Sequence, residues 1–529
     1  MNFLKSKFHF PFFTSLLLFS CFNSATAQVK NSDWYISQAP FKMPKIIVPS
    51  FRDKSFSIKD YGAVGNGQTL NTRAFEKAID ACSAAGGGKV IVPAGLWLTG
   101  PIQLKSNVNL VVERGALIQM TIDHSQFPII KSSDKSSNYV VASPIYGYGL
   151  ENVAITGQGI IDGAGETWRP VKKEKVTSSQ WKDFTSSGGA LSDNGKIWWP
   201  TKEAMNGEQY LKDLKKKKED LTADDYLPAR DFLRPYMVYL INCKNILLQD
   251  VTIRNSPKFV FYPNSCTNLT INHVNIFNAY WAQNGDGIDI SRCKNVLVYD
   301  CNVSAGDDGI CMKSSGKSND SKPNLENVVI AKCVVYHAHG GFVIGSNTDG
   351  GMQNIFVTDC NFIGTDIGVR VKSNAGRGGL VKNIYVKNIF MKDIIHEAIL
   401  FDTYYEDRPA GSKSNAPLKI QAKTPHFIDF YFDSIYCKGA ETAISITGLP
   451  QMPVDRIHFQ NMIISADKGL QATDAADLYL DNTKIISSKK PVFTLNRVKN
   501  ITVKGSGLED DKTNLYQADS STSGVKMED

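Results

Sequence analysis

The chain has 529 residues, of which 42% are hydrophobic and 21% are charged, and this is enough apolar material for a large buried core. Its formal net charge of +7 is not concentrated in one basic stripe, which argues against a nucleic-acid-binding protein. The same charge would suit a polyanionic ligand or an ordinary solvated surface equally well. After the N-terminal segment, no run approaches the ~20 consecutive apolar residues of a membrane-spanning helix.

The first segment in chain order is an apolar stretch at residues 8–22, which follows two lysines. Residues 25–27, Ala-Thr-Ala, are typical of a secretory cleavage site. We therefore expect residues 1–27 to be a signal peptide and the mature protein to be secreted or periplasmic. The alternative interpretation is a lipoprotein that is acylated at Cys21.

An amphipathic helix is predicted next, at residues 71–85, after an N-terminal extension at residues 28–54. Its apolar side chains recur at helical spacing, and the glycines at 86–88 end it. The repeats that follow would expose their core at the open end of the stack. We therefore interpret this helix as an N-terminal cap.

A segment at about residues 165–230 reads as an insertion into the repeats. Its lysine run at 215–218 is expected to form a solvated helix face. Its tryptophans either line a sugar-binding site, because aromatic faces stack on sugar rings, or pack the insertion against the rest of the protein; they are Trp168, Trp181, Trp198 and Trp199.

Short alternating strands, each introduced by asparagine, dominate the middle of the chain. The asparagines are spaced 23, 27, 32, 27 and 29 residues apart and are Asn245, Asn268, Asn295, Asn327, Asn354 and Asn383. Irregular periods of this length with period-two alternation indicate a β-solenoid, in which stacked coils share one core. We predict an all-β parallel β-helix over residues 55–505, with the asparagines forming a hydrogen-bonded ladder. Residues 506–529 are expected to be a polar, poorly ordered tail.

Seven cysteines lie in these strands, with no spacing typical of a zinc site. Cysteine can serve there as a small hydrophobic residue, so we expect packed thiols. One or two disulfides are the alternative in an oxidising compartment. The seven are Cys243, Cys266, Cys293, Cys301, Cys311, Cys333 and Cys360.

Four aspartates lie at coil spacing. Asp286 and Asp289 belong to the stretch that begins at Asn284, and Asp307 and Asp308 follow Asp286 by 21 and 22 residues, about one coil. Residues one coil apart stack at the strand spacing of ~4.8 Å. Clustered carboxylates raise the pKa of one member, so that it can hold a proton, and an acid–base pair of carboxyls is what glycoside hydrolysis requires.

Other interpretations of these aspartates remain open. An Asp-Asp-Gly sequence is often only a turn, and Asp289 can simply bond to a turn. A calcium site formed by Asp286, Asp307 and Asp308 is also chemically reasonable, because clustered oxygen atoms bind hard cations.

Further polar residues continue the series at coil-like intervals: His339, Arg370 and Tyr405. Arg370 and Lys372 are two residues apart and therefore lie on one strand face. Together they would form a cationic site for a carboxylate, which arginine can bind through two hydrogen bonds.

These motifs resemble glycoside hydrolase family 28, the polygalacturonase family, over about residues 56–395. The resemblance implies that the β-helix is right-handed and single-stranded, like that of the pectin lyases. The matching residues are Asn284, Asp286, Gly306, Asp307, Asp308, His339, Gly340, Arg370, Lys372 and Tyr405, with Tyr404 as an alternative to Tyr405 and with Ala338 in place of Gly or Ser before His339.

The resemblance implies an inverting hydrolase of galacturonan or pectin fragments, acting without a metal or organic cofactor, and we expect a monomer. Asp307 would be the general acid, and Asp286 and Asp308 would position and deprotonate the attacking water. Inverting enzymes usually place their two carboxyl groups ~6.5–9.5 Å apart. His339 would orient or tune the acid. The substrate-binding residues would be Asn284, Asp289, Arg370, Lys372 and Tyr405.

Residues 370–379 resemble the exo-acting bacterial members, and the insertion after Gly165 could close one end of the cleft. We therefore favour an exo-polygalacturonase. The alternatives are a rhamnogalacturonan or side-chain hydrolase of the same family, a calcium-dependent pectate lyase, and a non-catalytic β-helix adhesin or carbohydrate-binding protein.

Overall fold

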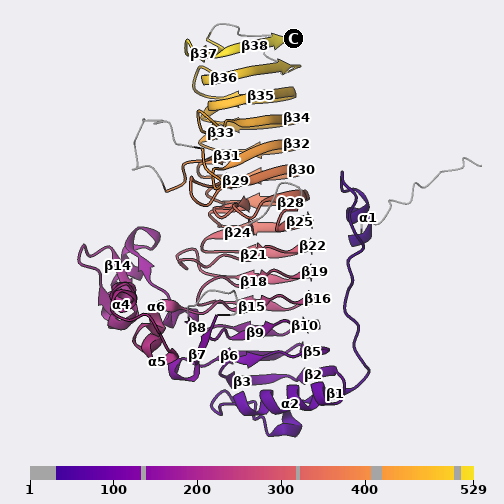
Figure 1. Cartoon of the computed structure of the whole chain (residues 1–529), viewed down its shortest axis with the longest axis vertical. Coiled ribbons are helices and arrows are strands. Elements are labelled where there is room, and N and C mark those ends of the chain that lie inside the picture. Colours follow the sequence, from indigo (N-terminus) through magenta and orange to yellow (C-terminus); the bar gives the residue numbers. More distant parts are fainter. Residues whose placement is uncertain (1–30, 133–138, 317–321, 407–419, 506–513, 529) are drawn as a thin grey trace, which may run out of the picture.

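The computed structural model describes residues 31–132, 139–316, 322–406, 420–505 and 514–528. The predicted signal peptide and Cys21 therefore lie outside the described residues. The described chain is a right-handed parallel β-helix with a single sheet of 33 strands wound into stacked coils (Figure 1). This confirms the predicted fold class. Among the described residues, none of the helices combines the length and apolarity needed to cross a bilayer.

Each coil contributes one strand to each of three ladders, and all pairings between coils are parallel. The first ladder, which positions the site described below, consists of β4 (Ile102–Gln103), β9 (Ile145–Tyr148), β15 (Val238–Ile241), β18 (Phe261–Asn264), β21 (Ile288–Ser291), β24 (Asp308–Lys313), β27 (Gly340–Ile344), β29 (Val369–Lys372), β31 (Glu397–Asp402) and β33 (Thr442–Thr447). The second consists of β1 (Ser55–Ser57), β2 (Gly88–Val92), β5 (Val108–Val112), β10 (Glu151–Thr156), β16 (Lys244–Gln249), β19 (Thr267–Asn272), β22 (Lys294–Tyr299) and β25 (Leu325–Ala331).

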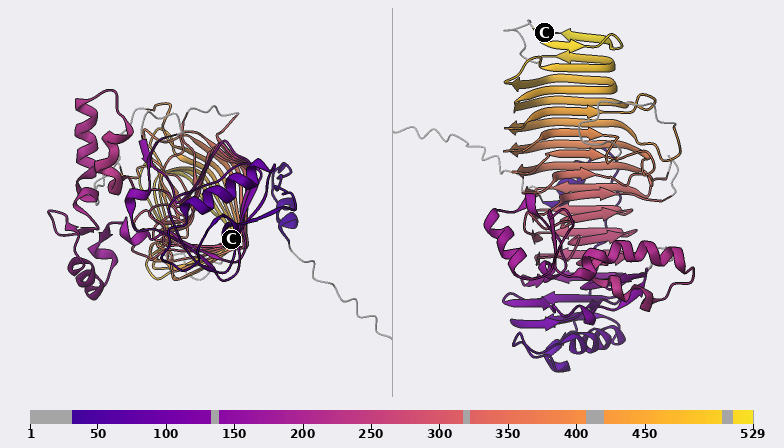
Figure 2. Two further views of the ribbon diagram at one scale, coloured as in Figure 1. Left: turned by 90° about the horizontal axis from the view of Figure 1, so that it is seen from below. Right: turned by 90° about the vertical axis from the view of Figure 1, so that its left-hand side faces the viewer.

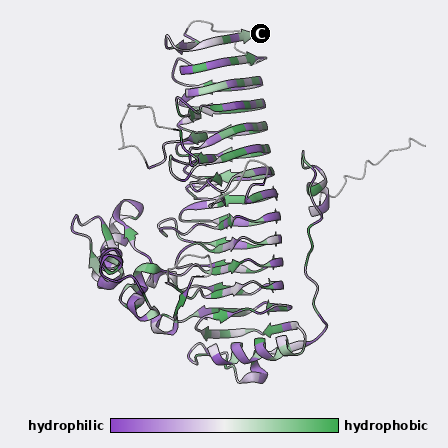
Figure 3. Ribbon diagram, in the orientation of Figure 1, coloured by the Kyte–Doolittle hydropathy of each residue, from purple (hydrophilic) through white to green (hydrophobic). Residues whose placement is uncertain are grey.

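The third ladder consists of β3 (Gly95–Thr99), β6 (Ala116–Met120), β11 (Ile160–Asp162), β17 (Thr252–Arg254), β20 (Asn275–Phe277), β23 (Asn302–Ser304) and β26 (Val334–Tyr336). In later coils neighbouring strands join into long strands. The second and third strands are joined in β28 (Met352–Ile363), β30 (Leu380–Lys392), β32 (His426–Lys438) and β34 (Val454–Ala466), all three are joined in β35 (Lys468–Ser487), and the first and second are joined in β36 (Phe493–Lys504). Hydrophobic and hydrophilic positions alternate along the strands, so that the apolar set fills the interior of the coils (Figure 3).

The asparagine ladder is present and explains the repeat motif. From Asn152 to Asn383, each side-chain amide donates a hydrogen bond to the side-chain oxygen of the asparagine one coil earlier, beginning with Asn107, at 2.9–3.3 Å. Every one of these asparagines has a positive φ, between 55° and 62°. Asparagine tolerates this left-handed conformation and bonds its stacked neighbour, and for these two reasons it recurs at the turn.

The helix α2 (Thr72–Ala84) covers the first coil with five buried side chains, including Phe75 and Ile79 (Figure 2). This confirms the predicted cap. All nine cysteines of the described residues are buried and free. They are core thiols, as expected, and the disulfide alternative is wrong for this part of the chain.

The N-terminal extension runs along the outside of the coils, on the side opposite the insertion (Figure 1). It contains the short helix α1 (Ser32–Ser37), and Tyr35 is buried with Leu297, Tyr299 and Phe356 in a small second cluster. The Tyr35 hydroxyl donates a hydrogen bond of 2.7 Å to Asp359 Oδ2. The extension therefore covers apolar side chains that face outward from the sheet.

The insertion forms a helical body beside the coils (Figure 2). Its elements are η3 (Gly165–Thr167), β12 (Val171–Lys172), η4 (Lys173–Lys175), α3 (Ser178–Ser186), β13 (Ala190–Leu191), β14 (Ile197–Trp199), α4 (Lys202–Lys217), α5 (Ala223–Tyr226), η5 (Leu227–Ala229) and α6 (Arg230–Leu233). Trp168 is 1% exposed and stacks on His124, and Trp198 is 7% exposed against Phe184, so both pack the insertion rather than line a site. The lysines at 215–218 are exposed, as predicted.

The strand pairing extends beyond the predicted end of the coils. The strands β37 (Tyr516–Ala518) and β38 (Ser523–Glu528) both pair in parallel with β36. The expectation of a poorly ordered tail is therefore wrong for residues 514–528. Polar composition misled the prediction because these short strands need only the exposed edge of β36 to satisfy their backbone hydrogen bonds. The remaining short elements are η1 (Ile58–Tyr61), η2 (His124–Gln126), β7 (Ile129–Lys131) and β8 (Tyr139–Val141).

Candidate active site

The predicted acid–base residues lie where strands of the first ladder begin. Asp286 precedes β21, Asp308 is the first residue of β24, and His339 precedes β27. Backbone hydrogen bonds fix these rows against one another: Gly287 N–H donates to the Asp308 carbonyl at 2.9 Å, and His339 N–H donates to the Asp307 carbonyl at 2.8 Å. Residues distant in sequence therefore meet at one edge because coil stacking aligns them.

The structure brings Asp286, Asp307 and Asp308 together. One carboxylate oxygen of each lies within 4.8 Å of the others. Asp286 and Asp308 are 3% and 1% exposed, and the Asp307 side chain is 19% exposed. These oxygens are closer than the ~6.5–9.5 Å usual for inverting glycosidases, so their separation alone does not determine the stereochemical outcome.

The same three oxygens are the atoms of the described residues that could hold a hard cation. Cationic side chains already lie against two of these aspartates. Lys313 Nζ is 3.5 Å from Asp286 Oδ2, and Lys372 Nζ is 2.8 Å from Asp308 Oδ2. These ammonium groups neutralise much of the negative charge that a divalent ion would need.

Asp308 is held as an anion. Burial by itself raises the pKa of this carboxyl, but the cations of Lys372 and Arg370 outweigh burial and bring its pKa below the usual range. The Arg370 guanidinium lies 3.4 Å from Asp308 Oδ1, whereas Lys372 contacts Oδ2, the other oxygen of the same carboxylate.

Asp286 has the opposite character. Burial, followed by the charges of Asp289 and Asp307, raises its pKa well above the usual range. Asp289 is 0% exposed, lies 3.3 Å from Lys313 Nζ, and has a pKa raised by burial to about 6 although Lys313 opposes the shift. The structure therefore does not bring Asp289 to the surface, where a polysaccharide could contact it. Its carboxylate lies against Lys313 and contributes to the raised pKa of Asp286.

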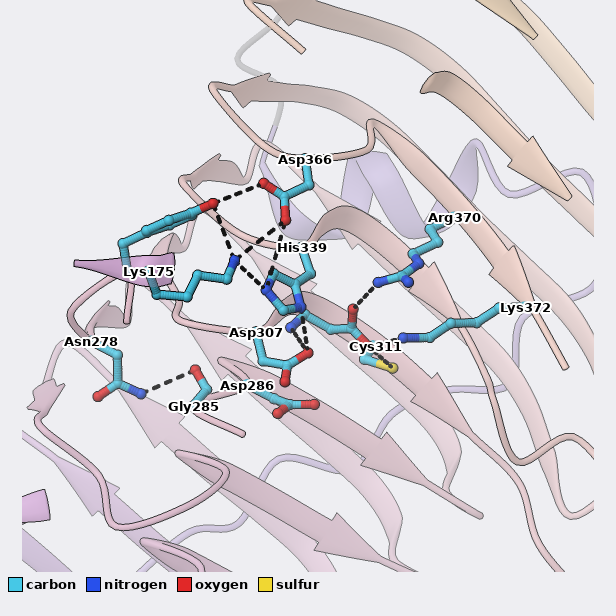
Figure 4. Close-up of polar contacts among 12 residues, drawn as sticks. Lys175, Asn278, Gly285, Asp286, Asp307, Cys311, His339, Asp366, Arg370 and Lys372 are labelled. Atoms are coloured by element: carbon cyan, nitrogen blue, oxygen red, sulfur yellow. Dashed lines mark hydrogen bonds and ion pairs between the residues drawn. The ribbon is translucent and has the colours of Figure 1, made fainter. Parts of the chain in front are cut away.

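Asp307 is linked to the insertion through His339. Burial raises the pKa of Asp307, but the hydrogen bond with His339 outweighs it and the net pKa is lowered. His339 Nδ1 lies 3.1 Å from Asp307 Oδ1, and Nε2 lies 2.9 Å from Lys175 Nζ (Figure 4). Because an ammonium group can only donate, Nε2 accepts and Nδ1 carries the hydrogen that is donated to Asp307. Lys175 thereby selects the tautomer of His339.

Two further side chains hold Lys175 in place. The Tyr280 hydroxyl is 3.1 Å from Lys175 Nζ, and Asp366 Oδ2 is 3.8 Å from it. Sequence reasoning missed Lys175 and Asp366. Lys175 lies in the insertion, 164 residues from its histidine partner, and neither residue belongs to a motif or repeat that would distinguish it.

The cationic pair lies beside the aspartates, with Tyr405 next to it. The Tyr405 ring centre is 4.9 Å from Lys372 Nζ and 5.5 Å from the Arg370 guanidinium carbon, and Arg377 contacts the same ring at 5.7 Å. Tyr404 is instead buried at 6% exposure. Of the two tyrosines, it is therefore Tyr405 that joins the cationic pair.

Asn284 is anchored from the segment that follows the insertion. Arg234 donates hydrogen bonds of 2.9 Å to the Asn284 side-chain oxygen and 3.0 Å to the Gln283 carbonyl. Asn284 also has a positive φ of 55°. Its side-chain oxygen is thus engaged in holding the loop that carries Asp286.

Comparison with known proteins agrees with this geometry. Residues 173–471, more than half of the chain, match the family described as "Glycosyl hydrolases family 28". The chain belongs to this family. Residues 55–190 also match the family described as "Rhamnogalacturonase A/epimerase, pectate lyase-like". The second match ends before the coils that carry the aspartates.

The relatives of this family 28 protein include two that bear on its activity. It is 28% identical over 477 residues to the exo-poly-alpha-D-galacturonosidase of Dickeya chrysanthemi, covering 85% of this chain and 74% of that protein. It is 30% identical over 343 residues to a probable polygalacturonase of Vitis vinifera, covering 64% of this chain and 60% of that protein. The chain thus matches less than two thirds of the length of the grapevine protein.

Solved structures share the fold. The exopolygalacturonase of Thermotoga maritima superposes with a TM-score of 0.65 at 24% identity, covering 94% of this chain and 95% of that one. The family 28 exopolygalacturonase of Yersinia enterocolitica gives a TM-score of 0.64 at 21% identity, covering 90% and 78%.

Proposed function

We propose that this family 28 protein hydrolyses α-1,4-galacturonosidic bonds of polygalacturonate. The observation that carries the proposal is the position of the Arg370–Lys372 pair beside three clustered aspartates. The aspartates supply acid–base chemistry, and the cations suit a sugar that bears a carboxylate. The substrate is an acidic polysaccharide such as homogalacturonan or a pectin fragment.

The roles of the aspartates follow from their charges. Asp307 donates a proton to the leaving oxygen, and Asp286 and Asp308 position the attacking water and accept its proton. The raised pKa of Asp286 makes it the more basic of these two. The lowered pKa of Asp307 means that it must gain a proton on binding. An anionic sugar provides the cause, since negative charge placed beside Asp307 raises the pKa of its carboxyl.

His339 donates from Nδ1 to Asp307 and orients it, and Arg370 and Lys372 bind the substrate carboxylate next to the cleaved bond. Tyr405 contacts the same sugar. We assign Asn284 and Asp289 indirect roles, through the loop that carries Asp286 and through Lys313. We propose inversion of the anomeric configuration, which proton NMR of the first product tests directly.

We further propose that the enzyme is exo-acting. The name of the Dickeya relative and the position of the insertion, whose Lys175 reaches His339, support this mode. Time-resolved sizing of products from polygalacturonate tests it: galacturonate monomer in the first minutes means exo action, and a ladder of oligomers means endo action.

Asp307→Asn is the decisive variant. We expect it to lower turnover by roughly 10²–10⁴-fold while its thermal unfolding and its binding of trigalacturonate stay close to those of the wild type. Turnover like that of the wild type would contradict the proposal. Binding without any hydrolysis by the wild type itself would instead favour a carbohydrate-binding protein.

Two other activities are separable by assay. The match of residues 55–190 to the rhamnogalacturonase profile favours rhamnogalacturonan as the second candidate substrate, and parallel digestions compare the two polymers. A calcium-dependent lyase would lose activity with a chelator and would release unsaturated products that absorb in the ultraviolet.

We also propose that the protein acts outside the cytoplasm after removal of residues 1–27, which N-terminal sequencing of the mature chain tests.

A further inference from the structure

A second pair of cations lies on the opposite side of the aspartates from Arg370 and Lys372. Arg234 and Lys258 are both half-buried, and neither forms an ion pair with any residue that the structure describes. Burial, followed by the positive charge of the neighbouring Arg234, lowers the pKa of Lys258 to about 8. Burial also lowers the pKa of Arg234, to about 10. Their positive charge is thus largely uncompensated, apart from the more distant Asp286.

Aromatic rings lie beside Lys258. Lys258 Nζ lies 4.9 Å from the centre of the Tyr236 ring and 5.9 Å from that of Phe259. Tyr236, Phe259 and Tyr262 contact one another with centroid separations of 4.5–5.4 Å. A cationic group set among aromatic rings repeats the arrangement of Lys372 and Tyr405.

Backbone pairing places the second pair next to the catalytic row. Lys258 is two residues before Val260, whose N–H donates to the Asp286 carbonyl at 2.9 Å. Arg234 donates hydrogen bonds to Gln283 and Asn284, three and two residues before Asp286. Four strand pairings separate β18 from β29. At a strand spacing of roughly 4.8 Å, the backbones of the two cationic sites are roughly 19 Å apart, with the aspartates between them.

From this arrangement we infer that Arg234 and Lys258 form a second carboxylate-binding site, for the galacturonate on the other side of the cleaved bond. This inference rests on the proposed function and deepens it. A free carboxylate on both flanking sugars is then required for full activity. The enzyme would therefore prefer unesterified homogalacturonan to rhamnogalacturonan, where one neighbour is a rhamnose without a carboxylate.

Lys258→Met is the better test variant, since Arg234 also holds Asn284. The binding of trigalacturonate and of its full methyl ester is measured by calorimetry in the inactive Asp307→Asn background. We expect Lys258→Met to weaken binding of the acid roughly 10–100-fold, the effect of losing one charge-assisted hydrogen bond. Binding of the ester should change by less than about threefold, because it has no carboxylate for Lys258 to hold.

Lys244→Met is the matched control, because Lys244 is exposed on β16 in the coil before Lys258. It should leave both affinities unchanged. Equal weakening of acid and ester by Lys258→Met, or no weakening of either, would overturn the inference. Absence of polygalacturonate hydrolysis by the wild type would instead overturn the proposed function, so the two failures are distinguishable.

Discussion

Removing the cation of Lys372 tests the electrostatics of the site. Its Nζ lies 2.8 Å from Asp308 Oδ2, and the two residues are 4% and 1% exposed. Lys372→Met keeps a side chain of similar length but removes the charge. Asp308 would then retain mainly the longer 3.4 Å contact with Arg370.

The direction of the effect follows from the lowered pKa of Asp308. A carboxyl whose folded pKa is depressed contributes stability above its unfolded pKa, and that contribution is lost as pH falls through the folded pKa. Without Lys372, the largest of the charges that oppose burial is lost and the pKa of Asp308 rises, so the carboxylate is lost at a higher pH. A buried charge-assisted hydrogen bond contributes about 1.5–3 kcal/mol. At 1.36 kcal/mol per pKa unit, the pKa of Asp308, and with it the acidic limb of the stability profile, should move up by about 1–2 pH units.

The assay is thermal unfolding as a function of pH, which gives the stability profile of the wild type and of Lys372→Met. Lys387→Met is the matched control, because it breaks a 2.9 Å lysine–aspartate pair on the exposed side of β30 and should leave the profile unchanged. An acidic limb that stays in place in a folded Lys372→Met enzyme would refute the reasoning.

Three further predictions concern the insertion, the ladder and the extension. Lys175→Met should lower kcat roughly 10–100-fold with little change in KM, because His339, which we propose orients Asp307, loses the donor that fixes its tautomer. Lys173→Met, in the same turn, should leave kcat unchanged, and an effect of Lys175→Met on KM alone would contradict a positioning role. Asn268→Ala breaks two ladder bonds of 2.9 and 3.3 Å and should lower the free energy of unfolding by about 1–3 kcal/mol in denaturant titrations. Tyr35→Phe removes the 2.7 Å hydrogen bond to Asp359 and should lower the free energy of unfolding by about 1 kcal/mol, while an unchanged unfolding midpoint would mean that this hydrogen bond does not stabilise the coils.

The fold could be predicted because its cause is local and repeated. Every coil needs a turn residue that tolerates a positive φ and bonds its stacked neighbour, so asparagine recurs visibly in sequence. The cap helix could likewise be predicted from the helical spacing of its apolar residues. The end of the coils could not be predicted, because β38 pairs along the existing edge of β36 and needs no apolar pattern of its own.

Part of the candidate site could also be predicted from the sequence. Asp286, Asp307 and Asp308 are one coil apart, and stacking converts that interval into proximity, so sequence alone brought the three carboxylates and the Arg370–Lys372 pair to one edge. The resemblance to family 28 rested on the motifs that contain these residues, and the match of residues 173–471 shows the membership.

What only the tertiary structure decided is the charge state of that edge. Lys175 reaches His339 from a separate helical body, Asp289 is buried against Lys313, and Arg234 and Lys258 meet the site from coils without a motif. These contacts depend on how long side chains from different coils and from the insertion converge in space. A pKa is set by that convergence and by burial, and neither has a period that a sequence displays.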